Sequence, residues 1–97
     1  MAQASSEHAS GRANVTATLP PDVDLHARPA ANFVRAAMRF AADVRVGTGD
    51  REVDAKSLLS VLALGARGGT ELRVSASGPD AGAALEELSA CIATLSD

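Results

Sequence analysis

Aromatic residues are scarce in this sequence, which has no Trp, no Tyr and two Phe among its 97 residues. Proteins that bind single-stranded nucleic acids stack bases on such rings, and these platforms are missing here. The net charge of −3 also gives no general attraction to nucleic acid or to an anionic membrane. We therefore expect no nucleic-acid partner. We also expect a core built from Leu, Val and Ala, since 46% of the residues are hydrophobic.

Cysteine is limited to Cys91, which cannot form an internal disulfide and so favours a reducing, cytoplasmic location. Cys91 lies near the apolar stripe of the last predicted helix, and we interpret it as a core residue and not as a nucleophile. His8, His26 and Cys91 share no ligand spacing, so we expect no metal. The glycines of "GARGG" match neither the phosphate-loop nor the dinucleotide-binding pattern, and we expect no cofactor.

Long apolar runs are also missing, because no segment reaches the roughly 18–20 apolar residues that a membrane span needs. We therefore expect no membrane insertion. Residues 1–13 are small and polar, without hydrophobic periodicity, which predicts a flexible N-terminal tail that contains His8. Residues 14–97 have the length and apolar content of one small domain with one core.

Hydrophobic periodicity divides this domain into alternating strands and helices. Period-two alternation predicts strands at Asn14–Leu19 and Glu71–Ser77, and "DVRVGTGDREVD" predicts two further strands joined by a glycine turn. A helical face from Ala27 onward places these residues in the core: Ala30, Phe33, Val34, Ala37, Met38 and Ala41. "AKSLLSVLALGARGG" predicts a short helix ended by glycines, and residues 78–97 predict the last helix.

The resulting order is β-α-β-β-α-β-α, which contains few strands relative to its helices. Two of the strands are joined by a tight turn, which favours antiparallel pairing. The sequence therefore predicts an α+β fold, in which an antiparallel sheet is covered by helices on one face.

The histidine of "LHARPA" lies where a helix begins. If His26 is the N-cap, Ala27, Arg28 and Pro29 form the first turn, where a proline removes no helical hydrogen bond. Free backbone N–H groups and the helix dipole attract anions there, and Arg28 adds a charged donor fork. A nucleophilic imidazole in this setting suits phosphoryl transfer through a phosphohistidine. A histidine that only caps the helix or lies on the surface is the alternative interpretation.

The motifs "LHARPA", "AKSLLSVLALGARGG" and "ELRVSASG" resemble HPr, the histidine-containing phosphocarrier of the bacterial phosphoenolpyruvate:sugar phosphotransferase system. The likeness runs from about Val15 to Leu95. It implies an open-faced β-sandwich, with a four-stranded antiparallel sheet of order 1-4-2-3 covered on one face by three helices.

The resemblance also implies a function. His26 accepts a phosphoryl group on Nδ1 from phosphorylated enzyme I and passes it to an enzyme II A domain. Arg28 matches the phosphate-stabilising arginine, and Pro29 matches the proline that fixes the geometry of the helix start. The chain is then a stoichiometric carrier in sugar uptake, expected to be a monomer, and not a stand-alone enzyme.

A second site implied by the resemblance is Ser57, which matches the serine that an HPr kinase/phosphorylase modifies in many relatives. From the local pattern Ser57 is first of all an N-cap, and the two roles are compatible. The resemblance further implies a partner-binding patch beside His26, made of apolar and basic residues: Leu58, Leu59, Leu62, Arg35 and Lys56. Such a patch suits acidic partner surfaces.

The sequence departs from the family pattern before the histidine. The family usually has glycine where this chain has Asp24, and the loop "PPDVD" is about two residues longer than usual. Asp22 and Asp24 bring negative charge near a site meant for phosphate. Two other functions stay open: a paralogue in a nitrogen-related or dihydroxyacetone phosphorelay, and a regulatory binding module that transfers nothing.

Overall fold

The computed structural model describes residues 12–97, and the predicted tail with His8 lies largely outside this range. Seven elements follow one another, and their bounds are these: β1 (Ala13–Thr18), α2 (Ala27–Ala37), β2 (Asp43–Thr48), β3 (Arg51–Asp54), α3 (Leu58–Leu64), β4 (Glu71–Ser77) and α4 (Ala81–Ala93). The predicted order of strands and helices is therefore confirmed.

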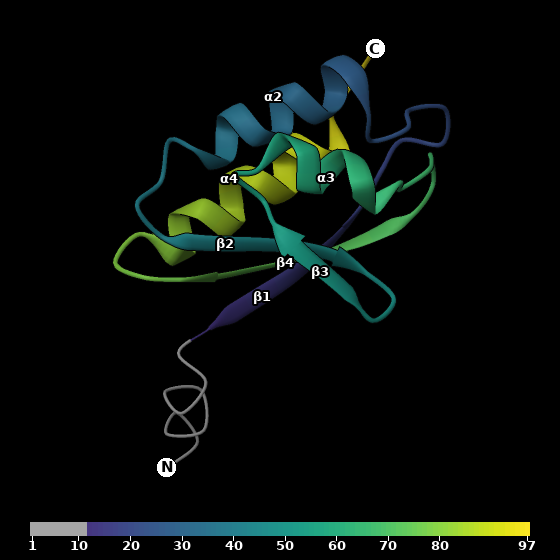
Figure 1. The fold of residues 1–97 in the computed structure, drawn as a ribbon. Helices are drawn as coiled ribbons and strands as arrows, with labels where there is room; N and C mark the ends of the chain where they lie inside the picture. The colour runs from purple at the N-terminus through teal and green to yellow at the C-terminus, as the bar shows by residue number, and fades with distance from the viewer. Residues whose placement is uncertain (1–11) are drawn as a thin grey trace.

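The four strands form one antiparallel sheet in the order β1-β4-β2-β3. Figure 1 shows the three helices gathered on one face of this sheet, so the molecule has two layers. The α+β open-faced sandwich with strand order 1-4-2-3 is confirmed. Between residues 12 and 97, no helix combines the length and the apolar character needed to cross a bilayer.

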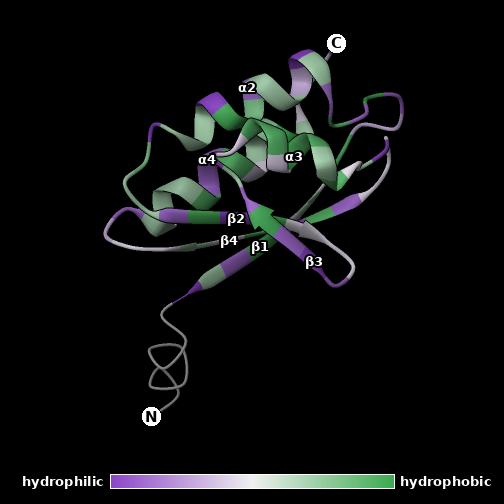
Figure 2. Ribbon diagram, viewed as in Figure 1, coloured by the Kyte–Doolittle hydropathy of each residue, from purple (hydrophilic) through white to green (hydrophobic). Residues whose placement is uncertain are grey.

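The register of the sheet aligns one row of valines across all the strands. Val74 of β4 pairs with Val15 on one side and with Val46 on the other, and Val46 pairs with Val53. Val74 and Val46 are fully buried beneath the helices. Because side chains alternate between the two faces of a strand, the neighbouring polar residues point to the open face. The alternating colours along the strands in Figure 2 follow this pattern.

The open face of the sheet carries a polar cluster where β1 and β2 begin and β4 ends. Arg12 donates hydrogen bonds to Asp43 Oδ2 at 3.0 Å and to the Ser75 hydroxyl at 3.2 Å. Ser75 is thereby buried although it lies on the outer face. The hydrogen bond from the Arg12 guanidinium lowers the pKa of the Asp43 carboxyl. Arg12 thus ties the start of β1 to β2 and β4.

Helix α2 ends earlier than the apolar pattern predicts. Met38 is 63% exposed and Ala41 is also exposed, so their prediction as core residues is wrong. The N–H groups of Arg39 and Phe40 donate to carbonyls three residues earlier, which tightens the last turn. Met38 itself still donates its N–H to the Val34 carbonyl at 2.9 Å, so the regular helical bonding ends just after it.

The connection from α2 to β2 is held by a carboxylate from the start of α4. Asp80 accepts hydrogen bonds from the backbone N–H of Ala41 at 2.9 Å and of Ala42 at 2.8 Å. The first of these bonds is the main reason that the pKa of Asp80 is lowered. The end of α2 is therefore fixed by a residue far along the chain, which a local pattern does not reveal.

Candidate functional site

His26 is the N-cap of α2, in the position that the motif predicts. Its backbone is extended (φ −147°, ψ 174°), and its side chain forms no capping hydrogen bond. The imidazole is 64% exposed. The side chain is therefore not part of the core and makes no hydrogen bond to the helix start, and the ring is largely open to solvent.

Ala27, the first residue of α2, has an unusual backbone conformation. Its φ is +52°, in the left-handed region, and it is the only non-glycine residue between 12 and 97 with a positive φ. An L-residue adopts this region at a cost of about 1–2 kcal/mol. The sequence gives no signal for it, because alanine and not glycine stands there. The strain lies directly beside the exposed imidazole, where strained residues often accompany function.

Arg28 and Pro29 complete the first turn and face different ways. Arg28 is exposed and forms no hydrogen bond or ion pair with any residue from 12 to 97. Pro29 is fully buried. The proline thus anchors the turn in the core, while the guanidinium stays available for a ligand on the side of the molecule that carries His26. The predicted grouping of histidine, arginine and proline at one helix start is what the structure has.

The segment before His26 is backed by the loop between α3 and β4. The N–H of Leu25 donates to the Ala66 carbonyl at 2.9 Å, and the N–H of Gly68 donates to Asp24 Oδ1 at 2.8 Å. A Cβ at Gly68 would lie 2.3 Å from the Pro21 carbonyl oxygen, so the two backbones touch there. The α3–β4 loop therefore holds the segment that leads into His26 in place.

Asp24 lies beside the imidazole, as the sequence suggests. Its Oδ2 is 3.9 Å from His26 Nε2, and its Oδ1 is 3.9 Å from Nε of Arg67. The sequence analysis missed Arg67, because nothing local links it to His26 and only the fold brings its loop to the site. The negative charge of Asp24 therefore has a cationic neighbour, and it lies on the Nε2 side of the ring.

Ser57 is the N-cap of α3, as predicted. Its hydroxyl oxygen accepts a hydrogen bond from the Ser60 N–H at 3.3 Å. The side chain is half-buried. Its capping role is therefore confirmed by geometry, and its place at the head of α3 puts it next to the exposed leucines of that helix.

The surface between α2 and α3 carries exposed apolar side chains. Leu59 is 80% exposed, Leu58 is 40% exposed, and Leu62 is half-buried against the core. Met38 adds to this surface from the end of α2, a residue that the sequence analysis assigned to the core. We refer to Met38, Leu58 and Leu59 as the apolar patch.

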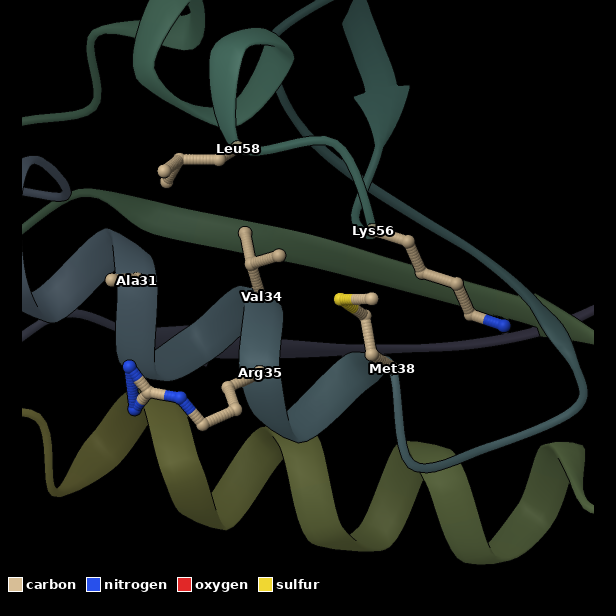
Figure 3. Close-up of a pocket in the computed structure, with 6 residues that line it drawn as sticks. All are labelled: Ala31, Val34, Arg35, Met38, Lys56 and Leu58. Atoms are coloured by element: carbon tan, nitrogen blue, oxygen red, sulfur yellow. The ribbon is translucent and has the colours of Figure 1, made fainter.

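A groove of about 340 Å³ runs along the patch, and Figure 3 shows the side chains that line it: Ala31, Val34, Arg35, Met38, Lys56 and Leu58. Lys56 donates from Nζ to the Phe40 carbonyl at 2.6 Å, and Arg35 donates to Asn32 Oδ1 at 2.9 Å. Both predicted basic residues therefore lie at the groove. Lys56 also ties the start of α3 to the end of α2.

Cys91 is half-buried on α4. Burial and the nearby Glu87 raise the pKa of its thiol, so the reactive thiolate form is disfavoured. Among residues 12–97 there is also no group of three or more His, Cys, Asp or Glu side chains that could hold a metal ion. Of the two residues 26 and 91, His26 is thus the exposed one, and Cys91 is half-buried.

Known proteins share the sequence pattern and the fold of this chain. A sequence model described as the PTS HPr component phosphorylation site matches residues 13–94. Phosphocarrier protein HPr of Haloferax volcanii is 43% identical over 81 residues, which cover 81% of this chain and 91% of that protein. A crystal structure of a phosphocarrier protein HPr from Bacillus anthracis superimposes with a TM-score of 0.79 and 33% identity, over 84% of this chain and 96% of that one.

One relative is much longer than this chain. A multiphosphoryl transfer protein of Xanthomonas campestris pv. campestris is 46% identical over 71 residues, which are 73% of this chain but only 8% of that protein. The chain thus spans a small part of that relative.

Proposed function

This chain belongs to the HPr family, the phosphocarriers of the phosphotransferase system, and from that premise we propose that His26 carries the phosphoryl group. The observation that supports this assignment best is the exposed imidazole, free of capping bonds, at the start of α2. A carrier needs a nucleophile that partner proteins can reach from solvent. His26 offers a nucleophilic nitrogen on an exposed ring, whereas Cys91 is half-buried and its thiol pKa is raised.

The proposed reaction is a transfer between two nitrogen atoms. The Nδ1 lone pair of His26 attacks the phosphorus held by a histidine of enzyme I, and the phosphorus–nitrogen bond of the donor breaks. In the second transfer, a histidine of an enzyme II A domain attacks the phosphorus on His26, and the bond between phosphorus and Nδ1 breaks. The exchange belongs to the cytoplasm, where phosphoenolpyruvate recharges the donor. Sugar uptake is the pathway that we propose for it.

Arg28 and the start of α2 stabilise the phosphoryl oxygens in this proposal. The guanidinium has no competing partner in the described chain, and a helix N-terminus favours negative charge by about 0.3–1 kcal/mol at an exposed site. Pro29, buried in the core, keeps the first turn in place. A modest stabilisation suits a carrier, since the group must also leave.

Partner proteins dock on the apolar patch and on the basic residues beside it. Leu58, Leu59 and the half-buried Leu62 supply apolar area on α3, and Arg35 and Lys56 supply positive charge at the groove. Arg28 extends this charge toward His26. The surface therefore fits the acidic, partly apolar binding faces that we propose for enzyme I and the enzyme II A domains. Because one chain contains all these residues, we propose that the protein acts as a monomer.

Incubation with enzyme I and labelled phosphoenolpyruvate tests the proposal. We expect the chain to take up one phosphoryl group that acid releases and alkali preserves, as a phosphoramidate does. Subsequent addition of an enzyme II A domain should remove the label. Lack of any acid-labile label on the folded wild-type chain contradicts the carrier function and favours a binding module.

Regulation at Ser57 is the second proposal. An N-cap serine at the head of α3 lies next to Leu58 and Leu59, so a phosphate there adds negative charge to the docking face. Modification by an HPr kinase/phosphorylase would then weaken docking of acidic partners without altering His26.

The variant Ser57→Asp, which keeps a capping oxygen, tests this second proposal. We expect roughly tenfold slower phosphorylation by enzyme I, because the added carboxylate repels an acidic partner at the patch. Ser57→Asn is the matched control, because it caps the helix without a charge. Equal rates for the two variants would contradict a regulatory role based on charge.

A further inference from the structure

The carboxylate of Asp24 has different neighbours at its two oxygens. Oδ1 accepts the Gly68 N–H at 2.8 Å, and Nε of Arg67 lies 3.9 Å away from it. Oδ2 lies 3.9 Å from Nε2 of His26. Since the backbone of the α3–β4 loop anchors one oxygen, the other oxygen is held toward the imidazole.

From this geometry we infer that Asp24 is a positioning residue for phosphoryl transfer, which accepts the Nε2–H of His26 and thereby keeps the Nδ1 lone pair directed at phosphorus. The inference rests on the proposed function of His26 and adds a residue to its mechanism. A neutral imidazole carries its proton on one nitrogen only, and a partner at that nitrogen selects the tautomer. A carboxylate serves this purpose in hydrolases that use a histidine base.

The distance of 3.9 Å between Asp24 Oδ2 and His26 Nε2 is longer than a hydrogen bond, and a rotation of the exposed ring toward Asp24 would bring it into that range. Such contacts are commonly long in an unliganded site and tighten when the reacting group binds. The anchoring bond from Gly68 keeps Oδ2 in reach during this movement.

The charge of the ring changes during transfer, and this gives Asp24 a second effect. When Nδ1 forms its bond to phosphorus and the donor bond breaks, Nε2 keeps its proton and the ring becomes cationic. The carboxylate beside Nε2 stabilises that charge. When the group leaves, the electron pair of the phosphorus–nitrogen bond returns to Nδ1 and the Nε2 proton stays in place. The positive charge of Arg67 reduces the repulsion between the Asp24 carboxylate and the phosphoryl oxygens.

The competing explanation is that Asp24 only anchors the loop through Gly68. Two variants separate these roles. Asp24→Asn keeps an oxygen for the Gly68 N–H but turns an NH₂ group toward Nε2, which can only donate and so favours a proton on Nδ1. Asp24→Gly removes both the anchor and the carboxylate and restores the residue usual in the family.

The experiment compares wild type, Asp24→Asn and Asp24→Gly in two measurements, after urea unfolding has shown that each is folded. The ring-nitrogen NMR signals of unphosphorylated His26 report its tautomer. The rate of phosphorylation by phosphoramidate reports nucleophilicity without a protein partner, since ammonia is the only leaving group.

We expect the proton on Nε2 in wild type, a shift toward Nδ1 in Asp24→Asn, and a rate for Asp24→Asn at least about tenfold below wild type. Asp24→Gly should lose less than Asp24→Asn. An Asn variant with the wild-type spectrum and rate, or a Gly variant that is slower than the Asn variant, overturns the inference. If the wild type accepts no phosphoryl group, the proposed function fails, whereas the ring-nitrogen signals still decide what Asp24 does to the imidazole.

Discussion

Replacement of His26 by alanine is expected to abolish phosphoryl uptake while it leaves the free energy of unfolding within about 1 kcal/mol of wild type. The imidazole is 64% exposed and forms no capping bond. Its contact with Asp24 at 3.9 Å involves two solvent-exposed side chains, and even a charged pair of this kind contributes only about 0–1 kcal/mol. The fold therefore does not depend on the ring, but the nucleophile is lost entirely.

Two measurements check this expectation: label uptake from phosphoenolpyruvate and enzyme I, and urea unfolding followed by circular dichroism. Arg28→Ala is the matched control, because it removes an exposed side chain from the same turn but leaves the nucleophile. The Arg28→Ala variant should accept the phosphoryl group more slowly than wild type, but uptake should still be measurable. Acid-labile label on His26→Ala would mean that another residue carries the phosphoryl group. Loss of more than about 3 kcal/mol of stability would instead indicate a structural histidine.

Gly68→Ala is expected to destabilise the fold by about 2–3 kcal/mol and to slow phosphoryl transfer. The added Cβ would lie 2.3 Å from the Pro21 carbonyl oxygen and 2.8 Å from its carbon, both of them backbone atoms that cannot rotate away. Either the α3–β4 loop or the segment before His26 must move. The same movement disturbs the Gly68–Asp24 hydrogen bond, so the imidazole loses its support.

Gly82→Ala is the matched control for this prediction. Gly82 lies in α4, and a Cβ there meets nothing within 4 Å. Alanine in a helix is better than glycine, so this variant should gain about 0.5 kcal/mol. Urea unfolding of the two variants gives the comparison directly. A Gly68→Ala protein as stable as wild type would mean that the two loops are not packed as closely as the structure has them.

The strands of this protein were predictable because apolar and polar residues alternate regularly along them. Val44 and Val46 lie two positions apart, as do Leu72, Val74 and Ala76, and this spacing turns each of them toward the helices. The end of α2 was not predictable in the same way. Met38 and Ala41 continue the apolar period of the helix, but α2 ends at Ala37, and Asp80 holds the backbone N–H groups of Ala41 and Ala42 beyond it.

The candidate site also has a part that the sequence predicts and a part that it does not. His26, Arg28 and Pro29 lie within one turn, so their grouping is local and can be read from the motif. Arg67 and the Gly68 hydrogen bond come from a loop far along the chain, and only the sheet topology brings that loop beneath His26. The positive φ of Ala27 had no signal either, since glycine is the residue that normally marks such a backbone.

The central claim is that one ring nitrogen, Nδ1 of His26, holds the phosphoryl group. NMR of the phosphorylated, nitrogen-15-labelled full chain tests it, because coupling between phosphorus and nitrogen identifies the bonded atom. We predict a single phosphoramidate signal, coupled to Nδ1 of His26. A signal coupled to Nε2, or phosphorus on His8 or Ser57 with an unmodified His26, would contradict the account.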